Sequence, residues 1–219
     1  MSKQEKAFKI GLIRVLTSED PEVLYAHQKQ IMEKFPTLTV ETKCIPDYPY
    51  GLYSPELSES AIPKIVETAK SFQDVDMIIV SCADDPGVRQ IRKAMPGMPV
   101  TGGGETTVAL ALRYGEKVGV LGITDYALDA YRRLLMGKMI LEKPKGVDST
   151  LDLMTPEGRR QVIASGMRLK EKGAEVIALA CTGLATIGAA KELEDATGLP
   201  VIDPVMAEGL FAYYESIRR

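Results

Sequence analysis

Two cysteines, Cys82 and Cys181, each follow a short apolar run, residues 77–81 and residues 176–180. Runs of this length and composition are typical of buried parallel strands. In open α/β sheets, ligands bind beyond the carboxyl ends of the strands, close to where helices begin. We therefore expect each strand to deliver one thiol to a ligand-binding edge.

Two thiols that face one carbon atom from opposite sides could invert its configuration. A thiolate would remove the proton as a general base, and the opposite thiol would return a proton to the other face. A helix N-terminus after each cysteine would favour the thiolate. Buried cysteines are often inert core residues, but the matched positions of Cys82 and Cys181 favour function.

The sequence around the cysteines repeats. Residues 97–100 (Gly-Met-Pro-Val) match residues 198–201 (Gly-Leu-Pro-Val), and the strand-like residues 9–13 match residues 117–121. This repetition predicts a duplicated α/β unit with two pseudo-symmetric lobes, parallel sheets and an active-site cleft between them. We place the first lobe at residues 1–106, joined by a final helix at 207–219, and the second at residues 107–206.

The residues that could bind a substrate surround the predicted strand ends. Hydroxyl groups and the backbone N–H groups after each cysteine could stabilise a carbanion, and the triple glycine at 102–104 lets the backbone approach a ligand or a strand closely. The candidates are Thr17, Ser18, Ala83, Asp84, Gly104, Glu105, Thr124, Thr182 and Gly183.

Other segments are predicted from local patterns. We expect one helix over residues 21–35 with His27 on its polar or boundary side, a helix that opens at Glu105, a helix capped by Thr124 and Asp125, and a short strand near Leu151. Cys44 is expected to be a small core residue. Residues 45–55 contain three prolines and form either a loop over the cleft, a subunit contact or a packed surface loop.

Composition excludes several classes of function. The net charge of −3 over 219 residues gives no reason to expect nucleic acid or a membrane surface as a partner. The N-terminus lacks the apolar core of a secretion signal, and three widely spaced cysteines favour a reducing compartment, so we expect a cytoplasmic protein. With a single histidine and no Cys-x-x-Cys pattern, a metal site is not expected.

Three motifs resemble the aspartate/glutamate/hydantoin racemase superfamily, and its hydantoin racemase branch in particular. Residues 82–87 resemble the Cys-x-x-Asp-Pro-Gly motif, residues 99–105 resemble Pro-Val-x-Gly-x-Gly-Glu, and residues 180–184 resemble the second cysteine motif. The resemblance implies flavodoxin-like lobes, racemisation by two cysteines without a cofactor, a homo-oligomer, and a final helix that packs on the first lobe. Ala83 and Asp84 replace the Asn-Thr usual in the amino-acid racemases, which disfavours aspartate or glutamate.

These patterns predict a racemase for a 5-substituted hydantoin or a related small carbon acid. The alternatives are an aspartate/glutamate-type racemase, a maleate-type cis–trans isomerase in which one cysteine is a nucleophile, and a regulatory protein that binds a small molecule without turnover. Fold alone does not decide between them.

Overall fold

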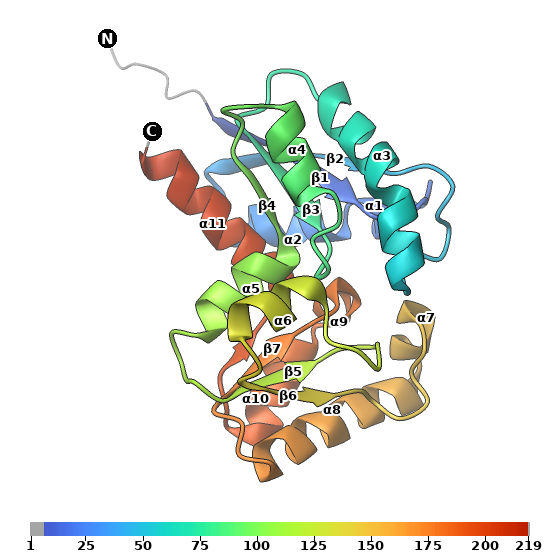
Figure 1. Cartoon of the computed structure of the whole chain (residues 1–219), viewed down its shortest axis with the longest axis vertical. Helices are drawn as coiled ribbons and strands as arrows, with labels where there is room; N and C mark the ends of the chain where they lie inside the picture. The colour runs from blue at the N-terminus through green and yellow to red at the C-terminus, as the bar shows by residue number, and fades with distance from the viewer. Residues whose placement is uncertain (1–6, 219) are drawn as a thin grey trace.

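Two four-stranded parallel sheets form the framework of the computed structural model, which describes residues 7–218 (Figure 1). The first sheet has the order β2-β1-β3-β4 and the second has the order β6-β5-β7-β8. This repeated order confirms the predicted α/β fold with two similar lobes. The strands are β1 (Phe8–Arg14), β2 (Leu38–Cys44), β3 (Met77–Ser81), β4 (Val100–Gly102), β5 (Val118–Leu121), β6 (Met139–Glu142), β7 (Val176–Leu179) and β8 (Val201–Ile202).

Helices flank both sheets and meet at the junction of the lobes, where α5 and α6 lie (Figure 1). The helices are α1 (Pro21–Leu24), α2 (Ala26–Lys34), α3 (Pro55–Ser71), α4 (Val88–Ala94), α5 (Gly103–Ala111), α6 (Asp129–Leu135), α7 (Thr150–Leu153), α8 (Pro156–Glu171), α9 (Thr182–Thr186), α10 (Ala189–Thr197) and α11 (Pro204–Arg218). Among residues 7–218, no helix combines the length and apolar character that a bilayer span requires.

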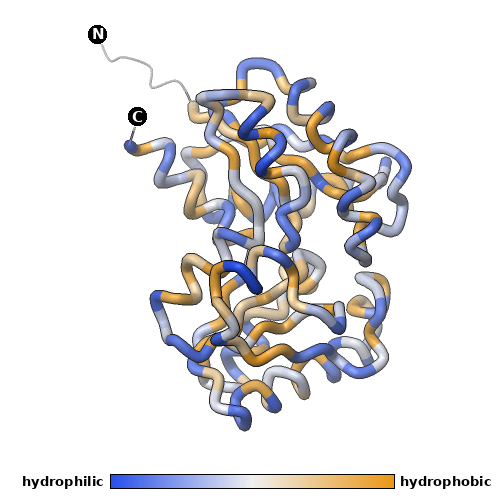
Figure 2. The backbone as a smooth tube through the Cα atoms, in the orientation of Figure 1, coloured by the Kyte–Doolittle hydropathy of each residue, from blue (hydrophilic) through white to orange (hydrophobic). Residues whose placement is uncertain are grey.

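The core of each lobe is built on its central strands. Every residue of β3 and of β7 is buried, and hydrophobic stretches run through the interior of both lobes (Figure 2). The last helix, α11, crosses back to the first lobe, where it contacts α2, β3 and α5. Its residues Val205 and Ala212 join Ile10, Leu12 and Ile79 in one hydrophobic cluster.

Three local predictions were wrong. The helix expected over residues 21–35 is interrupted at Tyr25, whose backbone angles (φ −95°, ψ 4°) depart from helical values, so that α1 ends before it and α2 begins after it. Thr124 does not cap α6, because its hydroxyl donates to the Tyr126 carbonyl in a turn and the helix starts later, at Asp129. Residues 150–153 form helix α7 rather than a strand, since the side chains of Ser149 and Asp152 form a capping box.

Two further predictions need correction. His27 is completely buried, whereas the sequence placed it on the polar or boundary side of its helix; the residues that surround it come from distant parts of the chain. Helix α5 starts at Gly103 rather than at Glu105. Its first turn therefore includes glycines that the sequence assigned to the preceding loop.

Candidate active site

A cavity of about 760 Å³ lies between the lobes, and both Cys82 and Cys181 line it. Cys82 follows β3 of the first lobe, and Cys181 follows β7 of the second. Cys44 ends β2 and is not among the described residues that line the cavity. The fold therefore brings together the two cysteines that the duplication singled out and leaves the third aside.

Most of the predicted binding residues also line this cavity. They are Thr17, Ser18, Ala83, Asp84, Thr124, Thr182 and Gly183. Gly104 and Glu105 do not, so their expected contact with a substrate needs correction. The backbone N–H groups of Gly104 and Glu105 instead donate to the Asp85 carboxylate, each at 2.7 Å. The Glu105 side chain points to Arg92 and Thr101.

The triple glycine allows α5 to pack against the turn that carries Cys82. A Cβ atom on Gly104 would lie 2.2 Å from the Ala83 carbonyl oxygen, and one on Gly102 would lie 2.2 Å from Asp85 Oδ1. A Cβ on Gly103 would come within 3.1 Å of the Cys82 carbonyl oxygen. These glycines thus allow a close approach to the turn that follows β3, whereas the sequence suggested an approach to a ligand or to a neighbouring strand.

Cys181 lies at the start of a helix, as predicted. It is the N-cap residue of α9, with extended backbone angles (φ −157°, ψ 125°). Burial raises the pKa of the Cys181 thiol, while the backbone N–H groups of Gly183 and Leu184 oppose that rise by favouring the thiolate.

Cys82 has a different environment, and here the predicted helix N-terminus is absent. A turn follows Cys82, and α4 begins only at Val88. Burial raises the pKa of the Cys82 thiol well above its ordinary value, and the carboxylates of Asp84 and Asp85 raise it further. A negative charge on Cys181 also raises this pKa. Cys181 is therefore the thiol that ionises more readily.

Acidic side chains outnumber basic ones around the cavity. The described residues that line it include Glu22, Asp84 and Asp148 but only one cation, Arg14. Arg14 is buried, and its guanidinium donates to the Val23 carbonyl at 2.5 Å. Burial also raises the pKa of the Asp84 carboxyl. An anionic substrate would meet little compensating positive charge here.

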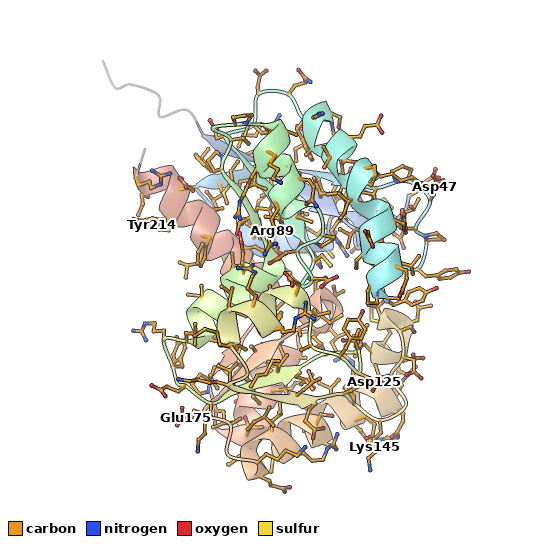
Figure 3. The ribbon with its side chains drawn as sticks, viewed as in Figure 1. Asp47, Arg89, Asp125, Lys145, Glu175 and Tyr214 are labelled. Carbon is orange, nitrogen blue, oxygen red and sulfur yellow. The ribbon has the colours of Figure 1, made fainter. Side chains whose placement is uncertain are left out.

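Contacts between the lobes support the Asp84 wall of the cavity. The backbone N–H of Asp129, at the start of α6, is 3.4 Å from Asp84 Oδ1. Arg89 lies in α4 near the junction of the lobes (Figure 3), and its guanidinium is 3.7 Å from the Asp129 carboxylate. The two lobes are thus connected directly beside the Cys82 turn.

The rim of the cavity is apolar and partly exposed, and most of it was missed from the sequence. Tyr50 and Tyr53 line the cavity from the first lobe, in the loop at residues 45–55. From the second lobe, Leu151 lines it within α7, and Met154 lines it directly after that helix. All four side chains are more than half exposed. The aromatic residues of the segment 45–55 were the sequence feature that could have indicated this rim. Of the three predictions made for that segment, the lining residues favour a loop over the cleft.

Residues 7–218 contain no group of three or more His, Cys, Asp or Glu side chains placed to hold a metal ion. The functional groups of the cavity are two thiols, several hydroxyls, backbone N–H groups and carboxylates. This set suits acid–base chemistry on a small molecule bound in the cavity.

The chain belongs to the Asp/Glu/hydantoin racemase family, whose model matches residues 10–208. A hydantoin racemase from Rhizobium meliloti is 28% identical over an alignment of 154 residues, and the alignment covers 62% of this chain and 58% of the length of that relative. One from Paenarthrobacter aurescens is 25% identical over 171 residues, covering 72% of this chain and 68% of the relative.

A similar fold occurs in the crystal structure of an allantoin racemase from Pseudomonas fluorescens. The TM-score is 0.78 at 19% identity, and the alignment covers 96% of this chain and 91% of that one. At this identity the similarity concerns the fold alone, and it agrees with the two-lobed architecture described above.

Proposed function

We propose that this chain is a racemase that uses Cys82 and Cys181 as opposed acid and base, without a cofactor, on a 5-substituted hydantoin or a related small carbon acid. The observation that carries this proposal is that both cysteines line one cavity, each supplied by a different lobe. Membership of the racemase family supports the same activity.

The chemistry needs one thiolate and one thiol. For one enantiomer, the Cys181 thiolate removes the proton from the stereocentre, and the Cys82 thiol donates its proton to the opposite face. The negative charge formed in between spreads onto the adjacent carbonyl group of the substrate. The hydroxyl of Thr182 and the backbone N–H groups around the cysteines are the groups available to stabilise that oxygen, because the Thr17 hydroxyl already donates to the Ile45 carbonyl. The roles of the thiols exchange for the other enantiomer.

The charge of the cavity favours a neutral substrate. A hydantoin ring carries amide and imide groups but no carboxylate, so it avoids repulsion from Glu22, Asp84 and Asp148. Aspartate, glutamate and maleate would bring carboxylates into a site where Arg14, the one cation among the described lining residues, already donates to a backbone carbonyl. The names of the sequence relatives agree with the hydantoin class.

A panel of single enantiomers in deuterium oxide tests this function. We expect 5-substituted hydantoins to lose optical rotation and gain deuterium at the stereocentre, while aspartate, glutamate and maleate remain unchanged. Activity should survive exhaustive chelation and need no added pyridoxal phosphate. Binding of a hydantoin without deuterium exchange would instead indicate a regulatory protein, and turnover of maleate would indicate a cis–trans isomerase.

A further inference from the structure

The single histidine of the chain, His27, connects the two lobes directly behind the cavity. Its Nδ1 atom is 2.8 Å from Ser81 Oγ, and its Nε2 atom is 3.3 Å from Thr186 Oγ1. Ser81 and Thr186 both line the cavity, whereas His27 does not. The imidazole therefore bridges two cavity walls without being positioned to contact a substrate.

The two partners of His27 are adjacent to the two thiols in the fold. Ser81 is the last residue of β3 and immediately precedes Cys82. Thr186 is the last residue of α9, the helix for which Cys181 is the N-cap. The ring thus connects the strand that carries one thiol to the helix that begins at the other.

Helix α2 holds His27 firmly in the first lobe. Ile31 packs in the hydrophobic cluster of that lobe, and Gln28 accepts a 2.8 Å hydrogen bond from Thr42. One turn after His27, the Gln30 side chain donates to the Ala185 carbonyl of α9 at 3.2 Å. The side chains of His27 and Gln30 therefore both hydrogen-bond to α9 of the other lobe, and that of His27 also hydrogen-bonds to β3.

The hydrogen bonds determine the state of the ring. The Ser81 hydroxyl donates to Glu208 Oε2 at 2.7 Å, so Ser81 accepts from an N–H at Nδ1 of His27. Nε2 is then an acceptor for the Thr186 hydroxyl, whose oxygen lies 3.3 Å both from Nε2 and from the Thr182 carbonyl oxygen, so the two acceptors share its hydrogen. Burial and the nearby Arg14 charge lower the pKa of His27 well below its ordinary value, which keeps the ring neutral.

We propose that His27 is a positioning residue that sets the separation of Cys82 and Cys181 through its hydrogen bonds to Ser81 and Thr186. The expected effect of His27 on turnover rests on the racemisation proposed above, whereas its effect on the separation of the thiols does not. A planar ring with a donor and an acceptor at fixed positions is a rigid spacer between the lobes. Inversion requires both thiols to reach one carbon atom, so its rate depends on that spacing.

Two variants test the role. His27→Phe removes both hydrogen bonds, and His27→Asn keeps an amide near the Nδ1 position but is too short to reach Thr186. The expected result is a fall in enantiomer interconversion of about 10²-fold, the cost of a ~1 Å misplacement. Deuterium exchange that keeps the configuration of the stereocentre should fall much less, because removal and return of a proton on one face need only one thiol. The control is Glu33→Gln, an exposed position on the same helix, which should match the wild type.

A second measurement does not depend on turnover. In a Cys44→Ser background, bifunctional thiol reagents of graded length should link Cys82 to Cys181 with a preferred spacer, read by intact mass. His27→Asn should shift or broaden that preference. If the preference is unchanged, or if interconversion and exchange fall in equal proportion, His27 does not set the spacing. If the preference shifts but the wild type turns over no hydantoin, the positioning role stands and the proposed function fails. Should His27→Phe not fold, His27→Asn alone decides.

Discussion

The Asp85 Oδ1 atom accepts a 2.7 Å hydrogen bond from the backbone N–H of Gly104. This bond ties the turn that carries Cys82 to the first turn of α5, the helix that leads from the first lobe to the second. Burial and the neighbouring Glu105 carboxylate raise the pKa of Asp85 to about 8. The position of the Cys82 thiol therefore depends on how closely α5 approaches this turn.

Gly104→Ala should disturb that approach. Its Cβ would lie 2.2 Å from the Ala83 carbonyl oxygen, an atom that cannot move aside without displacing the turn. We expect a loss of about 1–3 kcal/mol in the free energy of unfolding, as for other overpacked sites, together with reduced racemisation. Urea unfolding measures the first effect. Ala109→Ser, at an exposed position of the same helix, should change neither quantity, and a Gly104→Ala protein as stable as the wild type would contradict the predicted clash.

Serine at either catalytic position should abolish full racemisation. A hydroxyl is a far weaker acid than a thiol, so Cys82→Ser and Cys181→Ser should each lose at least the ~10²–10⁴ that general acid–base catalysis contributes. Each variant should still exchange the proton of one enantiomer, and the two variants should favour opposite enantiomers. Deuterium exchange on each pure enantiomer measures this.

Cys44→Ser is the matched control for these variants, because Cys44 does not line the cavity. Its turnover should stay within a few-fold of the wild type. Interconversion at the wild-type rate by Cys82→Ser or by Cys181→Ser would rule out the two-thiol mechanism.

The rate should fall at alkaline pH, and this alkaline limb of the pH profile should reflect the ionisation of Cys82. The active form needs one thiolate and one thiol, so activity should rise as Cys181 ionises and fall when Cys82 also ionises. After burial, the Asp84 carboxylate is the largest contributor to the raised pKa of Cys82. Asp84→Asn removes that charge, which should lower the Cys82 pKa and move the alkaline limb of kcat/KM to lower pH. An alkaline limb that stays in place would assign it to another group.

His27 should make the protein less stable in acid. Its pKa in the folded state lies well below the ordinary value of 6.5, so below about pH 6.5 the unfolded chain binds a proton that the folded chain does not. The free energy of unfolding should therefore fall as pH falls through this range, by up to about 1.4 kcal/mol per pH unit for one proton. His27→Asn lacks this contribution. Urea unfolding between pH 5 and pH 8 compares the two proteins, and equal slopes would mean that His27 titrates normally when folded.

Much of this architecture could be predicted from periodicity and repetition. The apolar runs before Cys82 and Cys181 predicted β3 and β7, and the repeat predicted two similar lobes, whose sheets have the same strand order in the structure. These features depend on local hydrophobic patterns, which sequence displays directly.

The features that could not be predicted depend on contacts between distant segments. Nothing near His27 in the sequence indicates Ser81 and Thr186 as its partners, so its complete burial was missed. Gly104 and Glu105 follow a strand, as a binding loop would, yet their N–H groups bind Asp85. In both cases the tertiary partner, rather than the local residue type, decides the role.

The crossing of α11 to the first lobe has a consequence for how the chain folds during its synthesis. During synthesis β1 and β3 leave the ribosome long before Val205 and Ala212, which cover part of their hydrophobic cluster. The sheet of the second lobe, by contrast, is complete at β8, just before α11 begins. Domains generally fold in the order of their synthesis, but here the lobe that is translated first must keep an apolar surface uncovered until residues 204–218 have emerged.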